Sequence, residues 1–321
     1  MYKKLILAAV LAAVTILAAC GDDRSDKEVV VDAFDSLLEA ESYESTSELD
    51  FELNGDMNDP MFDQASAMLN DFEFKVDQVY DANQQLQEAV IHFSGSMPPL
   101  TLDVEVPFLQ NLETQTMYIQ TDSIVENLGM FFPLPEEAAG KLLEINLEDL
   151  EDLEGEAPEF DQQEMEQRMQ QLLADFFEQK DESDFSSDGD EYTVSFNEDD
   201  FVYLVEAFMN EFDDLITDEE LAMVEQDLDE AVAELSEVMN IEQLDFSVVV
   251  DGDQLEQDSF VMDLLLEDPD SDESVKIYLA GHTTYSNFNE DVEFTIDPDN
   301  EEILDFEELE QMMMEAMMQG F

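Results

Sequence analysis

The sequence is poor in the residues with which enzymes build covalent or metal chemistry. It contains a single cysteine, Cys20, so the chain can form no internal disulfide bond. Its two histidines, His92 and His282, lie in separate strand-like segments where each is typical of a structural residue. No Ser-His-Asp triad, His/Cys metal-ligand spacing or glycine-rich phosphate loop can be assembled. The sequence therefore predicts a protein that is not an enzyme and has no cofactor.

Basic residues are equally scarce. The chain has 9 Lys+Arg against 86 Asp+Glu, which gives a formal net charge of -77. A field of this sign repels nucleic acid and anionic lipid headgroups, and it excludes nucleic-acid partners. It also pushes the chain apart in dilute buffer, whereas at ~1 M salt the Debye length falls to about 3 Å and screens the repulsion. We interpret the acidity as adaptation of an exported protein to high salt, with solvent cations around it, rather than as a specific cation store.

The high charge does not indicate a disordered chain. Hydrophobic residues make up 44% of the sequence, and 23 residues are phenylalanine. Disordered segments are poor in aromatic and apolar residues, because they cannot bury enough apolar surface to offset the entropy of folding. The composition therefore predicts a folded body with a substantial core.

The first part of the chain has the layout of a secretory signal. Lys3 and Lys4 form a positively charged start, and the apolar run Leu5–Leu17 that follows is too short for a comfortable membrane span. The run ends in Leu-Ala-Ala-Cys at Cys20, which resembles the lipobox of bacterial lipoproteins. That resemblance implies that residues 1–19 are a lipoprotein signal peptide. It also implies that Cys20 is the lipid attachment site, with a diacylglyceryl thioether and a further acyl group such as palmitate.

The residues after the signal are polar and charged, and we expect 20–28 to form a lipidated tether. Two acyl chains attach a protein firmly to a membrane, whereas one alone is marginal. Fully extended, residues 21–28 reach roughly 25 Å at ~3.3 Å per residue. The protein is therefore expected to be exported and anchored in the membrane through acyl chains on Cys20. Its folded body would lie at the outer face of the cytoplasmic membrane.

Apolar residues in the rest of the chain recur with helix and strand periods. Spacings of three and four residues predict helices over 29–40, 59–69, 161–180 and 306–318, with two more between 199 and 238. Alternating apolar and polar residues predict strands over 45–53, 72–76, 86–93, 100–106, 114–121, 142–147, 192–196, 244–250, 259–266, 274–284 and 292–296. Long alternating strands are typical of an antiparallel sheet with one face in water.

The order of these elements resembles that of the LolA/LppX-like lipoproteins of bacteria. A lipobox, a helix and long strands around a helical middle at about 161–238 agree with that family. The segments TTYSNFN at 283–289 and VEFTIDP at 292–298 are similar to the ending of its bacillar members of unknown function. The resemblance covers most of 29–298, the expected LolA-like domain. It implies an α+β fold, a curved antiparallel β-sheet or half-barrel with helices packed on its concave face. Better-understood relatives carry acyl chains or lipoproteins in that concavity, or sense envelope stress through it.

We therefore expect a non-enzymatic lipoprotein that binds a lipid or another hydrophobic ligand in the groove of the half-barrel. The inward strand faces and the Met-rich C-terminal helix of residues 299–321 supply the expected lining, because methionine offers soft, adaptable apolar surface. The candidate groove residues are Phe246, Val248, Val250, Phe260, Met262, Leu264, Ile277, Met313 and Met317. The Met-rich helix either packs on the sheet or occupies and gates the groove. The apolar loop 128–135 is either a cover for the core edge or a lid over the pocket.

Two other functions are open. The protein's own helices can fill the groove, which favours an envelope-stress sensor or a surface interaction module. A calcium-binding surface protein is the second alternative, because Asp297, Asp299 and Glu301, with Glu308 at the twelfth position, echo an EF-hand loop. Glu302 stands at the sixth position, however, where the sharp turn of such a loop needs glycine.

Overall fold

A computed structural model of the protein describes residues 24–55, 57, 60–97, 100–122, 124–125, 135–146, 168, 172, 176–177, 179–211, 239–267 and 274–319. The predicted signal peptide, Cys20, nearly all of the loop 128–135 and the second predicted helix between 199 and 238 lie outside these residues. Within the described ranges, no helix is both long enough and apolar enough to cross a membrane.

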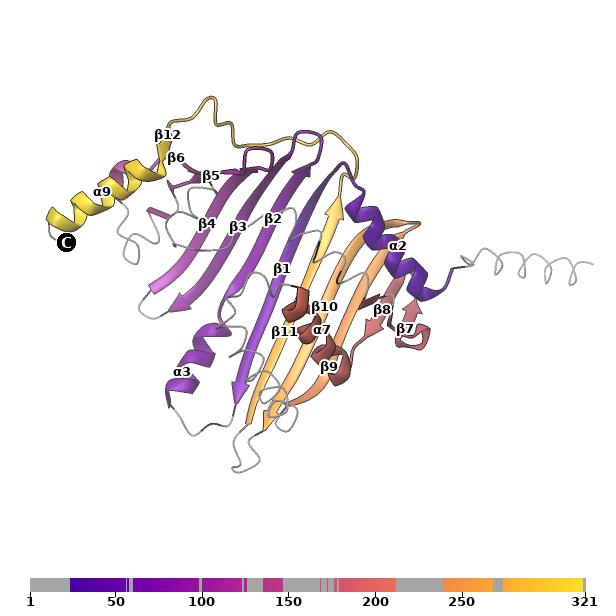
Figure 1. The fold of residues 1–321 in the computed structure, drawn as a ribbon. Helices are drawn as coiled ribbons and strands as arrows, with labels where there is room; N and C mark the ends of the chain where they lie inside the picture. The colour runs from indigo at the N-terminus through magenta and orange to yellow at the C-terminus, as the bar shows by residue number, and fades with distance from the viewer. Residues whose placement is uncertain are drawn as a thin grey trace, which may run out of the picture.

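The described strands form one curved, open sheet of twelve strands (Figure 1). In chain order they are β1 Ser42–Gly55, β2 Glu73–Asp81, β3 Leu86–Met97, β4 Leu100–Asn111, β5 Thr116–Gln120, β6 Leu142–Asn146, β7 Phe185–Asp188, β8 Glu191–Ser195, β9 Met239–Asp251, β10 Gln254–Glu267, β11 Ser274–Ser286 and β12 Ile303–Asp305. Across the sheet the order is β12-β6-β5-β4-β3-β2-β1-β11-β10-β9-β8-β7. Neighbouring strands are antiparallel, except that β12 and β6 run parallel. The predicted α+β half-barrel is confirmed.

The centre of the sheet joins the two ends of the chain. β1 pairs with β2 on one side and with β11 on the other, from Glu44 opposite Ser286 to Gly55 opposite Val275. The hydroxyl groups of Ser47 and Thr283, which lie 236 residues apart in the sequence, are 3.0 Å from one another across this ladder. The pairing of β1 with β11 therefore unites β2–β6 and β7–β10 in a single sheet.

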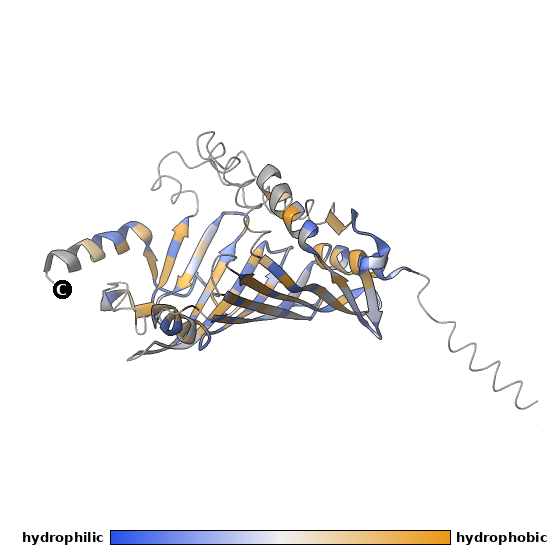
Figure 2. Ribbon diagram, turned by 90° about the horizontal axis from the view of Figure 1, so that it is seen from below, coloured by the Kyte–Doolittle hydropathy of each residue, from blue (hydrophilic) through white to orange (hydrophobic). Residues whose placement is uncertain are grey.

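The described α-helices are α2 Asp26–Leu38, α3 Pro60–Leu69, α7 Glu198–Glu211 and α9 Phe306–Gln319, and short 3-10 turns lie at Glu136–Ala138 and Glu182–Asp184. α2 begins at a capping box, because Ser25 Oγ accepts from the Glu28 N–H at 3.3 Å and the Glu28 carboxylate accepts from the Ser25 N–H at 2.7 Å. The curvature of the sheet is visible in Figure 2. We call the face on which α2 packs the concave face and the opposite one the convex face.

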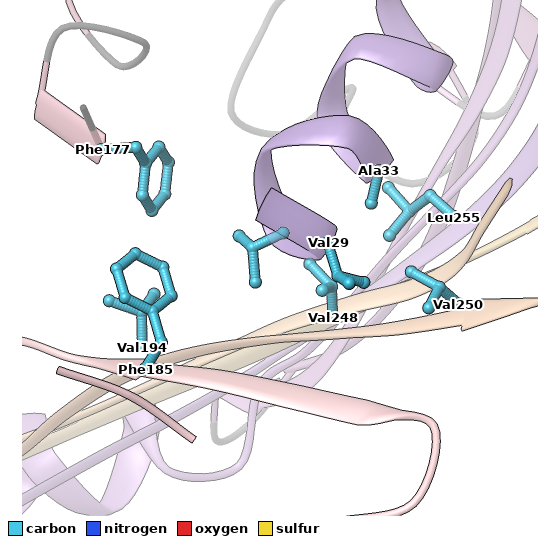
Figure 3. Close-up of a cluster of buried hydrophobic side chains, with 9 residues drawn as sticks. Val29, Ala33, Phe177, Phe185, Val194, Val248, Val250 and Leu255 are labelled. Atoms are coloured by element: carbon cyan, nitrogen blue, oxygen red, sulfur yellow. The ribbon is translucent and has the colours of Figure 1, made fainter. Parts of the chain in front are cut away.

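The larger core lies between α2 and the β7–β10 end of the sheet (Figure 3). Val30 of α2, Val248 of β9 and Leu255 of β10 are almost fully buried there. Burial of a branched apolar side chain stabilises a fold by about 1.5–3 kcal/mol, so this cluster fixes α2 on the concave face. The whole cluster consists of Val29, Val30, Ala33, Phe177, Phe185, Val194, Val248, Val250 and Leu255.

A second core lies at the opposite end of the sheet. Leu143 of β6 and Leu304 of β12 are register partners in the parallel pair, and both are buried. Ala138 and Leu309 complete this core, and Met312 and Met313 of α9 pack against it. The first turns of the Met-rich helix therefore lie on β6 and β12, far across the sheet from β9 and β10.

The predicted strand at 292–296 is wrong. The segment between β11 and β12 is irregular and packs on the convex face, where Ile296 is buried with Leu109 of β4. The Glu88 carboxylate accepts hydrogen bonds from the backbone N–H groups of Thr295 at 2.8 Å and Ile296 at 2.9 Å. A carboxylate thus replaces the acceptors of a strand ladder. The alternation in this segment reflects one-sided burial, which an irregular segment on a sheet surface shares with a strand.

Lys180 is a buried cation beside the larger core. Its side chain is 5% exposed, and Nζ lies 2.8 Å from Asp200, 3.0 Å from Asp184 and 5.6 Å above the ring of Phe196. Burial alone would lower the pKa of Lys180, but the hydrogen bonds to Asp200 and Asp184 outweigh burial and raise this pKa above its usual value. The stability that the cluster contributes is therefore complete below about pH 10 and is lost as the pH rises through the raised pKa.

Replacing this lysine tests the cluster. Lys180→Met is expected to lower the free energy of unfolding by about 2 kcal/mol at pH 8, because two carboxylates lose their cation while the apolar stem stays over Phe196. Denaturant unfolding at high salt measures the loss. Lys276→Met is the matched control, since Lys276 holds Glu242 and Asp263 at an exposed site and should change little. Equal losses in the two variants would contradict the importance of burial.

Candidate functional site

The concave face carries a continuous apolar surface that strand register brings together. Leu49 of β1 lies opposite Gly281 of β11 and Phe74 of β2, and register partners point to the same face of a sheet. The complete central row, from β4 to β9, is Val104, Phe93, Phe74, Leu49, Gly281, Phe260 and Phe246. Two shorter rows beside it are Phe51, Leu279 and Met262, and Leu53, Ile277 and Leu264. We call these three rows the apolar floor.

Two glycines in the floor strands give room to aromatic rings. A Cβ atom built on Gly281 would lie 2.5 Å from the ring of Phe260, so a larger residue there would displace that ring. A Cβ atom built on Gly95 of β3 would overlap Phe72, which follows α3. Phe72 stacks on Phe93 with 4.8 Å between the ring centroids. Phe62 of α3 likewise lies on the concave side of β1, because a Cβ atom built on Gly55 would be 2.8 Å from its ring. α3 therefore packs on the concave face, as α2 does, and this confirms the prediction of helices on that face.

Nearly all charged residues of the described strands point to the convex face of the sheet. Among the described strand residues that have a register partner, Asp258 of β10 is the one charged residue on the concave face. Lys75, His92, Lys276 and His282 all occupy convex positions in the same registers. A chain with 86 acidic residues thus keeps the concave side of its sheet nearly free of charge.

Register gathers the predicted groove residues of β9, β10 and β11 on the concave face. Those in the apolar floor are Phe246, Phe260, Met262, Leu264 and Ile277. Val248 and Val250 point the same way, but they belong to the core beneath α2, and Val248 is 0% exposed. Phe246 also packs on α2, because its ring stacks on that of Phe34 with 5.3 Å between the centroids. These three residues therefore hold the helix, and contact of the other four with a ligand stays a prediction.

The two methionines of α9 that were predicted to line the groove are not placed in the apolar floor by the described residues. Met313 packs against the core at the β6–β12 end, with Leu143 and Leu304. Met317 falls in the last part of α9, whose side chains lie outside the described residues, as does Cys20. Gating of the groove by this helix is therefore still a prediction.

Sequence reasoning missed the part of the floor that β1 and β2 supply. The alternation of Leu49, Phe51 and Leu53 predicts a strand, but no local signal places that strand beside Leu279 of β11. Phe74 of β2 is 37% exposed, so an open aromatic ring lies in the central row. Only the pairing of distant strands identifies these residues as neighbours of the predicted groove.

One end of the concave face is polar. The Tyr285 hydroxyl donates to the Asp258 carboxylate at 2.6 Å, and Thr283 is the register partner of Asp258. Burial raises the pKa of Asp258 above its usual value, although hydrogen bonds from Tyr285 and Thr283 act against it. Burial and the nearby Asp258 carboxylate raise the pKa of Tyr285 as well. The tyrosine therefore keeps its proton and is a fixed donor.

On the convex face, lysine and histidine side chains lie beside carboxylates. His92 Nε2 lies 3.1 Å from Asp77, His92 Nδ1 lies 3.4 Å from Glu105, and Lys75 Nζ lies 2.9 Å from Asp77. Burial alone would raise the pKa of Asp77, but hydrogen bonds from Thr46 and Lys75 and the nearby cations hold this pKa below its usual value. These contacts join β2, β3 and β4 on the outer side of the sheet, and the hydrogen bond from Thr46 to Asp77 adds β1.

The second histidine has a similar surrounding. His282 Nε2 lies 3.6 Å from the Glu48 carboxylate. Glu48, Lys75 and His92 also line an open hollow of about 400 Å³. Its charged side chains occupy convex register positions, so this hollow is distinct from the predicted groove. Both histidines have carboxylate neighbours on the outer face of the sheet.

The calcium alternative gains no ligand cluster from the described part of the chain. Among those residues, no group of three or more His, Cys, Asp or Glu side chains is placed to hold a metal ion. In the EF-hand-like segment, the Asp297 carboxylate accepts from the Asp299 N–H at 3.2 Å and from Asn300 Nδ2 at 2.6 Å, as in an Asx turn. Binding of calcium by this protein therefore stays an untested alternative.

The fold and the floor together define an open half-barrel with an apolar inner surface. A scan against protein-family models finds no match, and a search of curated proteins finds none either. Among solved structures, the chain is similar to the lipoprotein LppX of Mycobacterium tuberculosis, with 9% sequence identity and a TM-score of 0.28. The alignment covers 85% of this chain and 99% of that chain. So weak a likeness carries no functional argument.

Proposed function

We propose that this protein is an exported, non-enzymatic lipoprotein that binds a lipid or another hydrophobic ligand in the groove of its half-barrel. Acyl chains on Cys20 would anchor it at the outer face of the cytoplasmic membrane. The observation that carries the proposal is the apolar floor, three rows of apolar side chains in a chain of 86 acidic residues. With so acidic a composition, a broad uncharged surface implies that an apolar occupant covers it.

An acyl chain is a suitable occupant. Each methylene group removed from water contributes about 0.8 kcal/mol, from which the cost of ordering the ligand is subtracted. The exposed ring of Phe74 lies in the central row and offers direct contact to such a chain. The floor spans the sheet from β4 through β1 and β11 to β9, so the ligand would bridge strands from both halves of the sequence.

The start of the folded body supports the membrane location. Ser25 is the N-cap of α2, and α2 is fixed on the sheet by the larger core. Only four residues lie between Cys20 and Ser25, and the five residue-to-residue steps span at most ~18 Å when fully extended. The groove would therefore lie near the membrane from which a lipid ligand comes.

A self-filled groove is the second candidate. α2 already covers part of the concave face, where Val248 is fully buried, and Phe72 covers another part beside Phe93. A protein whose own segments fill the floor would act as an envelope-stress sensor or a surface interaction module. Uptake of a hydrophobic ligand separates the two candidates, because a filled floor takes up none.

A charge in the middle of the floor tests the proposal. Phe74→Glu is expected to weaken binding of monolauroylglycerol by at least about tenfold, because it places a carboxylate under the acyl chain. Binding is measured by titration calorimetry at ~1 M salt without detergent. The sample is the unacylated mature chain, residues 20–321 with Cys20→Ser, which contains every residue that the structure describes.

The matched control adds the same charge to the other face. Thr284→Glu in β11 lies at an exposed convex position and is expected to leave the affinity unchanged. Equal affinities in the wild type and both variants would place the ligand away from the floor. No uptake by the wild-type chain would favour the self-filled groove.

A further inference from the structure

The concave face changes in character along its strands. Towards the end of the sheet where β1 begins and β11 ends, the apolar floor gives way to hydroxyl, phenol and amide groups around Asp258. These polar residues follow the floor directly, since Ser47 and Thr283 are the next inward pair after Leu49 and Gly281. The set, which we call the polar end, is Tyr43, Ser45, Ser47, Gln78, Tyr80, Asp258, Thr283 and Tyr285.

The polar end is held in a connected arrangement. Tyr285 donates to Asp258 at 2.6 Å, and Gln78 Nε2 lies 3.4 Å from the Tyr43 hydroxyl. The ring of Tyr43 lies 5.2 Å from that of Tyr80 and 5.9 Å from that of Tyr285, measured between centroids. These contacts orient the polar groups before any ligand arrives, and preorganised groups bind with a smaller loss of entropy.

Asp258 sets the charge that this end accepts. It accepts hydrogen bonds from Tyr285 and Thr283, whereas an ionised carboxylate has about four acceptor positions. Further donors can therefore bind to it. The strand cations Lys75 and Lys276 lie on the convex face, engaged by acidic side chains. An anionic group at the polar end would thus meet a carboxylate without a strand cation to neutralise it.

We propose that the polar end is a head-group subsite for an amphiphile whose head donates hydrogen bonds and carries no negative charge, such as a hydroxyl-bearing acylglycerol. This inference rests on the proposed function, because the apolar floor would hold the tail of the same ligand. From Ser47 to Leu53 the β1 strand extends for about 20 Å at ~3.3 Å per residue, which leaves room for a long acyl chain below the head. Heads with a carboxylate or phosphate are disfavoured.

Two ligands with the same acyl chain test the subsite. Monolauroylglycerol has a neutral head with two hydroxyl groups, and laurate has an anionic head without a donor. The unacylated mature chain, residues 20–321 with Cys20→Ser, is titrated at pH 8.5 in ~1 M salt, where the Debye length of about 3 Å removes the long-range repulsion of the whole chain. We expect monolauroylglycerol to bind at least about tenfold more tightly than laurate, a difference that nearby charge can produce.

The variant Asp258→Asn should reduce this preference to about threefold or less, because asparagine keeps an acceptor for Tyr285 without the charge. Asp258→Ser is the second variant, should the first not fold by circular dichroism. Asp50→Asn removes the same charge from the exposed convex side of β1 and should leave the preference intact.

The outcomes separate the two proposals. Uptake of both ligands with equal affinity, or a preference that Asp258→Asn leaves unchanged, overturns the head-group subsite while ligand binding in the groove stands. Tighter binding of laurate than of monolauroylglycerol also overturns it. Failure of the wild-type chain to bind either ligand overturns both proposals.

Discussion

The folded body is expected to lose most of its stability when salt is withdrawn. Lowering the salt from ~1 M to about 0.01 M lengthens the Debye length from about 3 Å to about 30 Å, so that the repulsion among 86 carboxylates acts across the whole sheet. The convex face of β1 is an example of this repulsion, because the carboxylates of Glu48, Asp50 and Glu52 are all exposed along one strand. We expect the midpoint of thermal unfolding, followed by circular dichroism, to fall by about 20 °C or more.

An uncharged co-solvent is the control for this experiment. Sucrose at the same osmolarity as ~1 M sodium chloride should restore only a small part of the lost stability, because it favours compact states without screening charge. A midpoint that is the same at both salt concentrations would contradict the interpretation of the acidity as adaptation to high salt. Full recovery with ~1 mM calcium chloride at low sodium would instead support the calcium alternative.

Glu88→Ala is expected to cost about 3 kcal/mol of unfolding free energy at ~1 M salt, the largest effect that we expect of a single carboxylate. Glu88 is 4% exposed and accepts three hydrogen bonds, from the Thr295 N–H at 2.8 Å, the Thr295 hydroxyl at 2.6 Å and the Ile296 N–H at 2.9 Å. Alanine leaves these donors without their acceptor, and the Ile296 N–H is buried. Denaturant unfolding measures the loss.

Hydrogen exchange can show which part of the molecule is destabilised by Glu88→Ala. The segment that Glu88 holds leads into β12 and α9, so hydrogen exchange should accelerate at Leu304 and Leu309 before it does in the α2 core. Glu105→Ala removes a carboxylate from the same face, where the Glu105 side chain is 65% exposed, and should cost little. Equal losses for the two variants would mean that the hydrogen bonds from Thr295 and Ile296 do not hold the segment.

The sequence predicts strands best where one face is wet and the other is covered. Leu49, Phe51 and Leu53 alternate with acids, and the structure places a strand there, because period-two alternation follows directly from side chains pointing to opposite faces. The same rule is wrong for 292–296, where one-sided burial occurs without a ladder. It also misses β12, since the three residues Ile303–Asp305 are too short for a period.

Some residues of the candidate site are predicted by local alternation, and others are revealed only by strand pairing. The inward residues of β10 and β11, such as Phe260 and Ile277, are predicted by alternation within each strand. The position of Phe74 in the apolar floor, and of Asp258 as the one charged strand residue on the described concave face, depend on the register of β1 between β2 and β11. No local pattern distinguishes Asp258 from the other acidic residues, because its position follows from pairings with distant segments.

The sequence by itself determined the class of most elements in the described part of the chain, the acidic composition and the expected lipid attachment at Cys20. These properties depend on local periodicity, on composition and on a short motif, none of which requires a fold. The tertiary structure alone decided that β1 joins β11, that α9 packs on β6 and β12, and that nearly all charged residues of the described strands point to the convex face. Such features arise because pairing across 236 residues and the burial of whole faces are settled by the complete sheet, in which each strand is placed by its neighbours.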